Sequence, residues 1–305
     1  MRIGTRRSAL ALAQANLIAE RLRTGRQGDW EIVPMTTSGD RGAMQEDKSR
    51  WVVELEDALL DGEIDLAVHS AKDLPGELPA GLALLGAPAR ASHADVLCGA
   101  RTLEELEPGA RVGTSSIRRM AQLRAAREDL DVVAVRGNVD TRLEKLANGD
   151  SGVRAIVLAR AGLERLGREA DIGGELDAVS FVPAPGQGAL ALEGRADADS
   201  TRHAVEAITD PASLCCLLAE RALALALGAS CHTPLGALAR PVAADGLRLS
   251  AWIGLPDGSA WAADELTGAM SAPEALGAEL AARLSAAGGA DMLLRAEEMA
   301  GAGSA

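Results

Sequence analysis

The stretch that decides the fold is "WVVELEDALLDGEIDLAVHSAKDLP" (residues 51–75), which predicts a helix followed directly by a strand. Residues 51–62 have a helical apolar pattern and end at Gly62, a residue that commonly ends helices. The apolar run in 63–70 predicts a buried strand. Because "WEIVPMT" (30–36) predicts another strand before this helix, the order is strand, helix, strand. This order indicates a parallel sheet in an α/β protein.

Four polar side chains stand at the end of the strand in 63–70, just before Pro75: His69, Ser70, Lys72 and Asp73. One interpretation is that Lys72 and Asp73 form a solvated pair on a turn. The alternative is a functional site, because open α/β sheets bind ligands beyond the carboxyl ends of their strands.

The same alternation extends along the chain and predicts more than one domain, since 305 residues exceed what one hydrophobic core usually serves. It begins at "RIGT" (2–5) and resumes after residue 94. The Pro- and Gly-rich stretch 181–195 suggests a crossing between domains, and Asp257-Gly258 predicts a hairpin further on. We therefore expect an α/β fold with three domains, formed by residues 1–90 with 187–206, by 94–182, and by 211–305.

The composition excludes several classes of partner. The net charge of −13 provides no global attraction to nucleic acid or to an anionic membrane, and four Trp, one Phe and no Tyr leave few stacking surfaces. No apolar run is long enough to span a membrane. The first 25 residues are Arg-rich, as in a transit peptide, but their pattern favours a strand, a cap and a helix. Any anionic ligand must therefore be held by a local cluster of basic residues.

Metal and disulfide sites have little support in the sequence. The four cysteines show no C-x-x-C spacing, and the four histidines are scattered. Cys215 and Cys216 stand in an apolar helical pattern and are interpreted as core residues. Cys231 stands in the loop "LGASCHTPLGA" (227–237), where it is either a structural thiol or a nucleophile or attachment point.

Arginines and small polar residues gather where predicted strands give way to helices. These positions are Arg6 and Ser8 after the first strand, Thr114, Ser115, Ser116, Arg118 and Arg119 after a second, and Arg136 and Arg142 after a third. One such Arg alone would be interpreted as a surface residue, but a helix N-terminus with an added Arg is suited to an anion. Because the nucleotide-binding glycine motifs are missing, the pattern favours a ligand with several carboxylates.

The chain resembles the porphobilinogen deaminase (hydroxymethylbilane synthase) family. The motifs that carry the resemblance are, in order, "RIGTRRSALALAQA", "AVHSAKDLP", "VGTSSIRR", "VRGNVDTRLEKL", "PAPGQGALALE" and "AERALALALGASCHTPLGA". The resemblance implies two α/β domains similar to periplasmic binding proteins and transferrins, which flank a cleft, and a smaller C-terminal α+β domain. It also implies a transferase of tetrapyrrole and haem biosynthesis, which we expect to be a cytoplasmic monomer that acts on a small molecule.

In that family, four porphobilinogen molecules condense head to tail into hydroxymethylbilane, and each loses ammonia. Chain growth takes place on a dipyrromethane cofactor, which the resemblance attaches to Cys231 through a thioether. The resemblance makes Asp73 the catalytic carboxylate, assisted by Lys72. It assigns cofactor contacts to Ser70, Lys72, Asp73, Thr114, Ser115, Ser116, Arg118 and Arg119, and substrate contacts to Arg6, Ser8, Lys48, Arg136, Arg142 and Gln187.

The chain departs from the family pattern in three places. The lid segment "RGAMQEDKSR" (41–50) is shorter than usual, Trp51 replaces a Phe, and Ala229-Ser230 replaces a Gly pair before Cys231. The same fold and arginines would also suit an anion-binding protein without catalysis, and release of ammonia from porphobilinogen separates the two interpretations.

Overall fold

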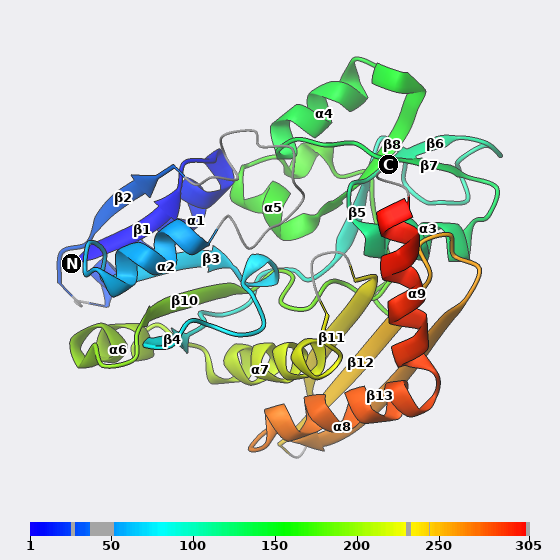
Figure 1. Ribbon diagram of the computed structural model, residues 1–305. Helices are drawn as coiled ribbons and strands as arrows, with labels where there is room; N and C mark the ends of the chain where they lie inside the picture. Colours follow the sequence, from blue (N-terminus) through cyan, green and yellow to red (C-terminus); the bar gives the residue numbers. More distant parts are fainter. Residues whose placement is uncertain (26–27, 37–51, 230–232, 244, 303–305) are drawn as a thin grey trace. The chain divides into compact units, whose positions relative to one another are not determined.

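The computed structural model describes residues 1–25, 28–36, 52–229, 233–243 and 245–302 (Figure 1). Contacts divide the chain into two compact units, Met1–Ala91 with Gly188–Leu217 and Ser92–Gln187 with Leu218–Ala305. The division into three domains stays a prediction.

The first unit is built on a five-stranded sheet with the order β2-β1-β3-β10-β4. β1 pairs in parallel with β2 and β3, whereas β10 pairs antiparallel with β3 and β4. The elements are β1 (Arg2–Arg6), α1 (Ala9–Thr24), β2 (Glu31–Met35), α2 (Val53–Leu60), β3 (Leu66–Ser70), the short helix η3 (Ala71–Asp73), β4 (Leu82–Gly86), β10 (Leu190–Arg195), α6 (Asp199–Glu206) and the start of α7 (Pro211–Ala226).

The prediction that these strands run parallel is confirmed for β1, β2 and β3, as is the inner position of β3. The stretch 181–195, which predicted a crossing between domains, also contains the strand β10, which was not predicted. Because β10 pairs antiparallel with β3 and β4, the sheet is mixed and the prediction of a parallel sheet is corrected. The Pro and Gly residues in this stretch mask the alternation that follows, in which Leu190 and Leu192 are buried.

Helices on both faces of β3 explain its unbroken apolar run. Leu66 and Val68 pack in the cluster that contains Ile18 and Leu22 of α1. Ala67, one residue along, packs instead with residues of α2. Successive side chains of a strand point to opposite faces, so both faces of an inner strand must be apolar here. The same alternation places His69 on the face of Ala67.

The sheet of the second unit has the order β7-β6-β8-β5-β9. β6 is parallel to β7 and β8, and β5 is antiparallel to β8 and β9, so the pattern repeats that of the first sheet. Its elements are β5 (Asp95–Cys98), β6 (Arg111–Gly113), α3 (Ile117–Ala126), β7 (Asp131–Val133), α4 (Val139–Ala147), η4 (Asp150–Gly152), β8 (Val153–Ala159), α5 (Arg160–Arg165), η5 (Glu169–Asp171) and β9 (Gly174–Glu175). The mixed α/β class is confirmed.

A three-stranded antiparallel sheet, β11-β12-β13, completes the second unit. It consists of β11 (Leu235–Val242), β12 (Gly246–Gly254) and β13 (Trp261–Ala269), followed by α8 (Pro273–Ala286) and α9 (Gly289–Ala302). Gly258 has a φ of +76° in the predicted turn between β12 and β13, a conformation that favours Gly. Trp252 of β12 packs with Ala121 of α3, which joins this sheet to the rest of the unit.

The buried carboxylate of Glu220 on α7 supports the segment before β10. It accepts backbone N–H bonds from Gly186 at 2.6 Å and from Ala239 at 2.7 Å. Glu220 therefore fixes the turn that leads to Gln187. Within the described part of the chain, no helix is both long and apolar enough to cross a membrane.

Candidate active site

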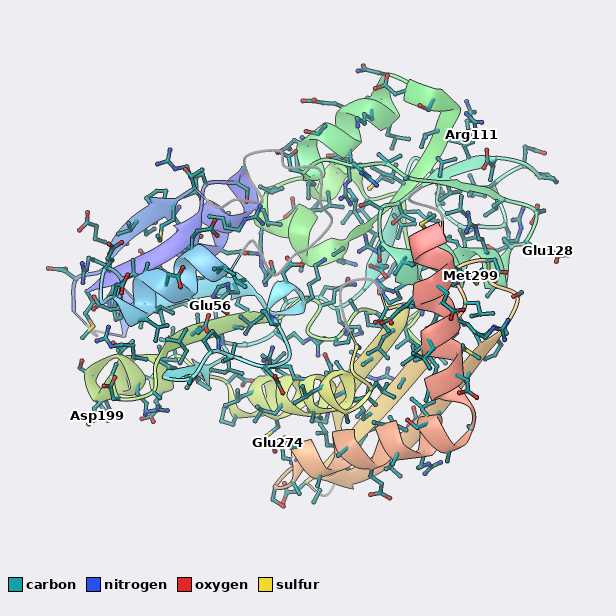
Figure 2. The ribbon with its side chains drawn as sticks, viewed as in Figure 1. Glu56, Arg111, Glu128, Asp199, Glu274 and Met299 are labelled. Carbon is teal, nitrogen blue, oxygen red and sulfur yellow. The ribbon has the colours of Figure 1, made fainter. Side chains whose placement is uncertain are left out.

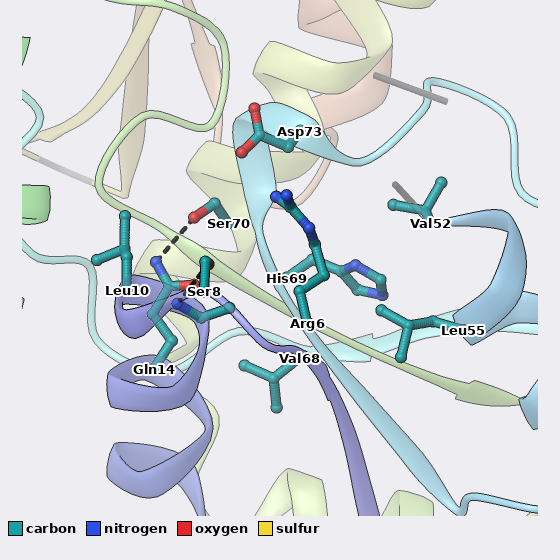
Figure 3. A pocket seen from close by; sticks show the side chains of 11 residues that line it. Arg6, Ser8, Leu10, Gln14, Val52, Leu55, Val68, His69, Ser70 and Asp73 are labelled. Atoms are coloured by element: carbon teal, nitrogen blue, oxygen red, sulfur yellow. Dashed lines mark hydrogen bonds between the residues drawn. The ribbon is translucent and has the colours of Figure 1, made fainter. Parts of the chain in front are cut away.

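A pocket in the first unit lies where α1 begins and β3 ends (Figure 3). Its empty volume is about 450 Å³, part of which is open to solvent. The polar side chains that line it are Arg6, Ser8, Gln14, His69, Ser70 and Asp73. Four of these, Arg6, Ser8, Ser70 and Asp73, are residues that the sequence analysis selected for binding or catalysis.

A hydrogen bond ties the two sides of this pocket together. Ser8 caps α1, and its Oγ accepts the N–H of Ala11 at 3.3 Å. Gln14, in the next turn, donates from Nε2 to Oγ of Ser70 at 2.8 Å. Because Ser70 accepts this bond, its own hydroxyl proton can be donated to a ligand. The N-terminus of α1 and two hydroxyls thus converge on one space, an arrangement suited to carboxylate oxygens.

Asp73 is placed by the short helix η3, which continues directly from β3. The N–H of Ala71 donates to the carbonyl of Ala189 on the chain leading into β10, at 3.0 Å. This bond anchors the turn at its first residue, and Asp73 at its last residue is only partly buried. Figure 3 shows the Arg6 side chain extending toward Asp73. Lys72 is partly buried on the same turn and does not line the pocket as the described residues form it.

Three buried titratable side chains gather beside this pocket: His69 of β3, Glu193 of β10 and Glu56 of α2. His69 Nε2 lies 2.9 Å from Oε2 of Glu193, in ion-pair contact but without a well-aligned hydrogen bond. Glu56 and Glu193 are 6% and 0% exposed. Burial raises the pKa of Glu56 to about 7, Glu193 adds to the rise and His69 opposes it. Neither glutamate was predicted from the sequence, where each is a single carboxylate within an otherwise apolar pattern.

The raised pKa of Glu56 predicts a stability that depends on pH. The folded protein binds a proton at Glu56 more tightly than the unfolded chain, so this contribution is complete below pH 4.5 and is lost as the pH rises through 7. We expect Glu56→Gln to gain stability relative to the unsubstituted protein as the pH rises from 5 to 8, by up to about 3 kcal/mol. Urea unfolding at both pH values measures this gain. An equal difference at pH 5 and pH 8 would contradict it.

The second unit has a buried group built around Asp95 of β5. Arg118 Nη2 lies 2.8 Å from Oδ2 of Asp95, and Arg119 Nη2 lies 2.6 Å from Oδ1. Gln187 Nε2 donates to the same Oδ1 at 2.9 Å. Arg118 also donates to the carbonyl of Val182 at 2.8 Å, and Arg119 to a carbonyl of β8 at 2.9 Å. The predicted residues Arg118, Arg119 and Gln187 are therefore brought together, with Asp95 as a partner that the sequence analysis missed.

The charge balance of this group favours an ionised Asp95. Burial by itself would raise the pKa of Asp95, but the guanidinium groups of Arg118 and Arg119 outweigh it and hold that pKa well below its usual range. The two arginines are only 3% and 5% exposed. One carboxylate facing two guanidinium groups leaves a net positive charge, and this is the electrostatic condition for attracting an anion.

The other predicted residues of this unit lie at the starts of α3 and α4. Ser116 caps α3, Thr114 is buried beside it, and Ser115 is exposed. Arg136 is exposed, and Arg142 donates from Nε to the carbonyl of Gly137 at 2.8 Å. These positions agree with the predicted junctions between strands and helices.

Two predicted site residues, Cys231 and Lys48, lie outside the described residues, as does the lid segment 41–50. Cys216 is 4% exposed and Cys215 is partly buried. A further thiol, Cys98, is buried, and this raises its pKa to about 11, so it is a poor nucleophile. Among the described residues there is no group of three or more His, Cys, Asp or Glu placed to hold a metal ion.

Comparison with known proteins places the chain in a family. Residues 1–203 match the family described as porphobilinogen deaminase, dipyromethane cofactor binding domain, and residues 214–286 match its C-terminal domain. A porphobilinogen deaminase from Thermus thermophilus is 46% identical over 95% of this chain and 97% of its own length. One from Deinococcus radiodurans is 43% identical over 95% and 97%.

Among solved structures, a periplasmic substrate-binding protein of an ABC transporter from Coxiella burnetii is similar over 70% of this chain and 94% of its own, with 14% identity and a TM-score of 0.42. The sequence matches cover both units, from the start of β1 to the end of α8. The chain belongs to the porphobilinogen deaminase family.

Proposed function

We propose that this protein is a porphobilinogen deaminase that condenses four porphobilinogen molecules into hydroxymethylbilane and releases ammonia at each step. The observation that carries the proposal is the pocket at the start of α1, where Asp73 shares one space with Arg6, Ser8 and Ser70. It lies within the residues that match the cofactor-binding domain of the family.

The pocket offers what the substrate requires. Porphobilinogen carries an acetate and a propionate on a pyrrole ring, together with a protonated aminomethyl group. Arg6 and the hydroxyls of Ser8 and Ser70 provide cationic and neutral donors for the carboxylates. Asp73 provides an acceptor for the pyrrole N–H and a negative charge for the cation that forms when ammonia leaves.

Asp73 is also suited to assist the departure of the protonated amine, which leaves as ammonia. Its carboxylate holds the ammonium group in place, and stabilises the positive charge that remains on the pyrrole after the C–N bond breaks. Lys72, on the same turn, adds a cation for ligand carboxylates. The new bond forms to the α-carbon of the growing chain, which then loses its proton.

The residues present fit a dipyrromethane cofactor. When bound, the cofactor supplies the α-carbon on which the chain grows. Its carboxylates require several donors, which we assign to Arg118, Arg119, Thr114, Ser115 and Ser116 at the start of α3. Nε of Arg118 is buried and has no hydrogen-bond partner among the described residues, which supports this assignment. We assign the thioether link to Cys231, and further substrate contacts to Arg136, Arg142, Gln187 and Lys48. The three-domain division, a cytoplasmic location and a monomeric state belong to the same proposal.

Incubation of the purified protein with porphobilinogen tests the function directly. We expect stoichiometric release of ammonia, formation of hydroxymethylbilane, and an intact mass that exceeds the chain by a dipyrromethane unit, with peptide mapping placing the excess on Cys231. A protein that binds porphobilinogen but releases no ammonia, even after the cofactor is supplied, would instead be an anion-binding protein on the same fold.

A further inference from the structure

The buried cluster of Glu56, His69 and Glu193 adjoins the pocket, and neither glutamate is among the residues that line it. His69 is the member that lines the pocket, together with Leu55, the neighbour of Glu56 on α2. Figure 2 marks Glu56 on α2, the helix that contacts both β3 and β10. In Figure 3 the His69 ring lies between Leu55 and the side chain of Arg6. The charge of Glu56, which does not line the pocket, therefore acts on it across the intervening side chains.

The cluster must bind protons to remain buried. Two ionised carboxylates beside a neutral imidazole would place two negative charges in a site where Glu193 is 0% exposed. Oε1 of Glu56 and both oxygens of Glu193 accept no hydrogen bond within the described chain, so no donor there offsets the lost hydration. A neutral Glu56 reduces the negative charge that the cluster buries, which agrees with the raised pKa of Glu56.

We infer that Glu56, acting through His69 and Glu193, sets the electrostatic potential of the pocket wall and so controls how strongly the pocket binds a carboxylate-bearing ligand. Glu56 is a positioning residue in this role, because it does not line the pocket itself. The inference rests on the proposed function for the identity of that ligand, porphobilinogen.

The charged groups that act on Glu56 come from three elements packed together. The charges that act on it are Glu193 from β10, His69 from β3 and, on its own helix, Asp57, which is exposed to solvent. Across the pocket, β1 contributes Arg6 and the turn after β3 contributes Asp73. The pKa of Glu56, about 7, is close to physiological pH, so a small change in pH changes the charge of Glu56.

Ionisation of Glu56 adds one negative charge behind the pocket and repels the carboxylates of the ligand. Ligand binding must in turn favour the protonated form of Glu56, because coupling between two binding events is reciprocal. The affinity for porphobilinogen is therefore expected to fall as the pH rises through 7. The effect appears in KM and leaves kcat nearly unchanged.

The test compares KM for porphobilinogen in the unsubstituted enzyme and in Glu56→Gln from pH 6 to pH 8. At each pH we divide the KM of the unsubstituted enzyme by the KM of Glu56→Gln, so that titrations common to both enzymes cancel. We expect this ratio to rise about three- to tenfold from pH 6 to pH 8, while the corresponding ratio of kcat values stays constant. Glu63→Gln removes an exposed carboxylate just beyond α2 and is expected to leave the KM ratio flat. Glu56→Met is a second variant in case Gln prevents folding.

A KM ratio that does not change with pH would overturn the inference even if ammonia is released normally. If no ammonia is released at any pH, the proposed function fails, and calorimetric binding of porphobilinogen at pH 6 and pH 8 decides the inference separately. An NMR titration of the protein labelled with ¹³C-glutamate measures the pKa of Glu56 in the absence of ligand. A Glu56 signal that titrates in the ordinary range of a glutamate would also overturn it.

Discussion

Asp73→Asn is expected to lower the rate of ammonia release by about a hundredfold or more, with folding and cofactor attachment intact. The amide keeps the shape of the side chain and its position on η3, but it loses the negative charge that stabilises the cation left by ammonia. The bond between Gln14 and Ser70 and the cap at Ser8 do not involve Asp73, so we expect both to be retained.

Single-turnover release of ammonia from porphobilinogen measures this effect, and intact mass confirms that the variant still carries its cofactor. Glu77→Gln, an exposed carboxylate in the loop after β3, is the matched control and should retain full activity. Turnover of Asp73→Asn close to that of the unsubstituted enzyme would remove Asp73 from the chemistry.

Asp95→Asn is expected to destabilise the second unit by about 3–5 kcal/mol, because it leaves two buried guanidinium groups without a counter-charge. Asp95 accepts bonds from Arg118, Arg119 and Gln187, and it joins α3 to the segment that leads toward β10. The pKa of Asp95 lies below that of the unfolded chain, so its contribution is present above about pH 4 and is lost as the pH falls further.

Chemical unfolding at pH 7 measures this loss. The matched control is Asp131→Asn, which breaks a pair with Arg111 in which both side chains are 47% exposed, and which should cost less than about 1 kcal/mol. Equal losses in the two variants would mean that the buried pair is no stronger than a surface pair. The cofactor content of Asp95→Asn should fall as well if Arg118 and Arg119 also contact the cofactor.

The sequence predicted those parts of the fold that depend on local periodicity. The helix α2 and the strand β3 follow from their apolar patterns, and β3 could be recognised as an inner strand because both of its faces are apolar. β10 was missed because its pairing with β3 and β4 is antiparallel and distant in sequence, and Pro and Gly residues precede it. Local rules give no information on which distant strand fills a gap in a sheet.

The site was predictable to the extent that sheet topology gathers its residues. Arg6 ends β1 and Ser8 follows it, while Ser70 ends β3 and Asp73 follows it, so two parallel neighbours bring all four residues to one edge. Asp95 was not predictable, because a single Asp at the start of an apolar strand gives no sign of the two arginines that it meets from α3. Its role depends on tertiary packing alone.

The strand orders of the two sheets have a consequence for how the chain is made. Every strand of the second five-stranded sheet lies between Asp95 and Glu175, whereas the first sheet needs β10, which ends at Arg195. During synthesis the second sheet can therefore complete its strand pairing first, while the edges of β3 and β4 that pair with β10 are still exposed. If the ribosome stalled before Leu190, the nascent chain would lack β10, the strand that joins β3 to β4, and its first sheet would stay incomplete.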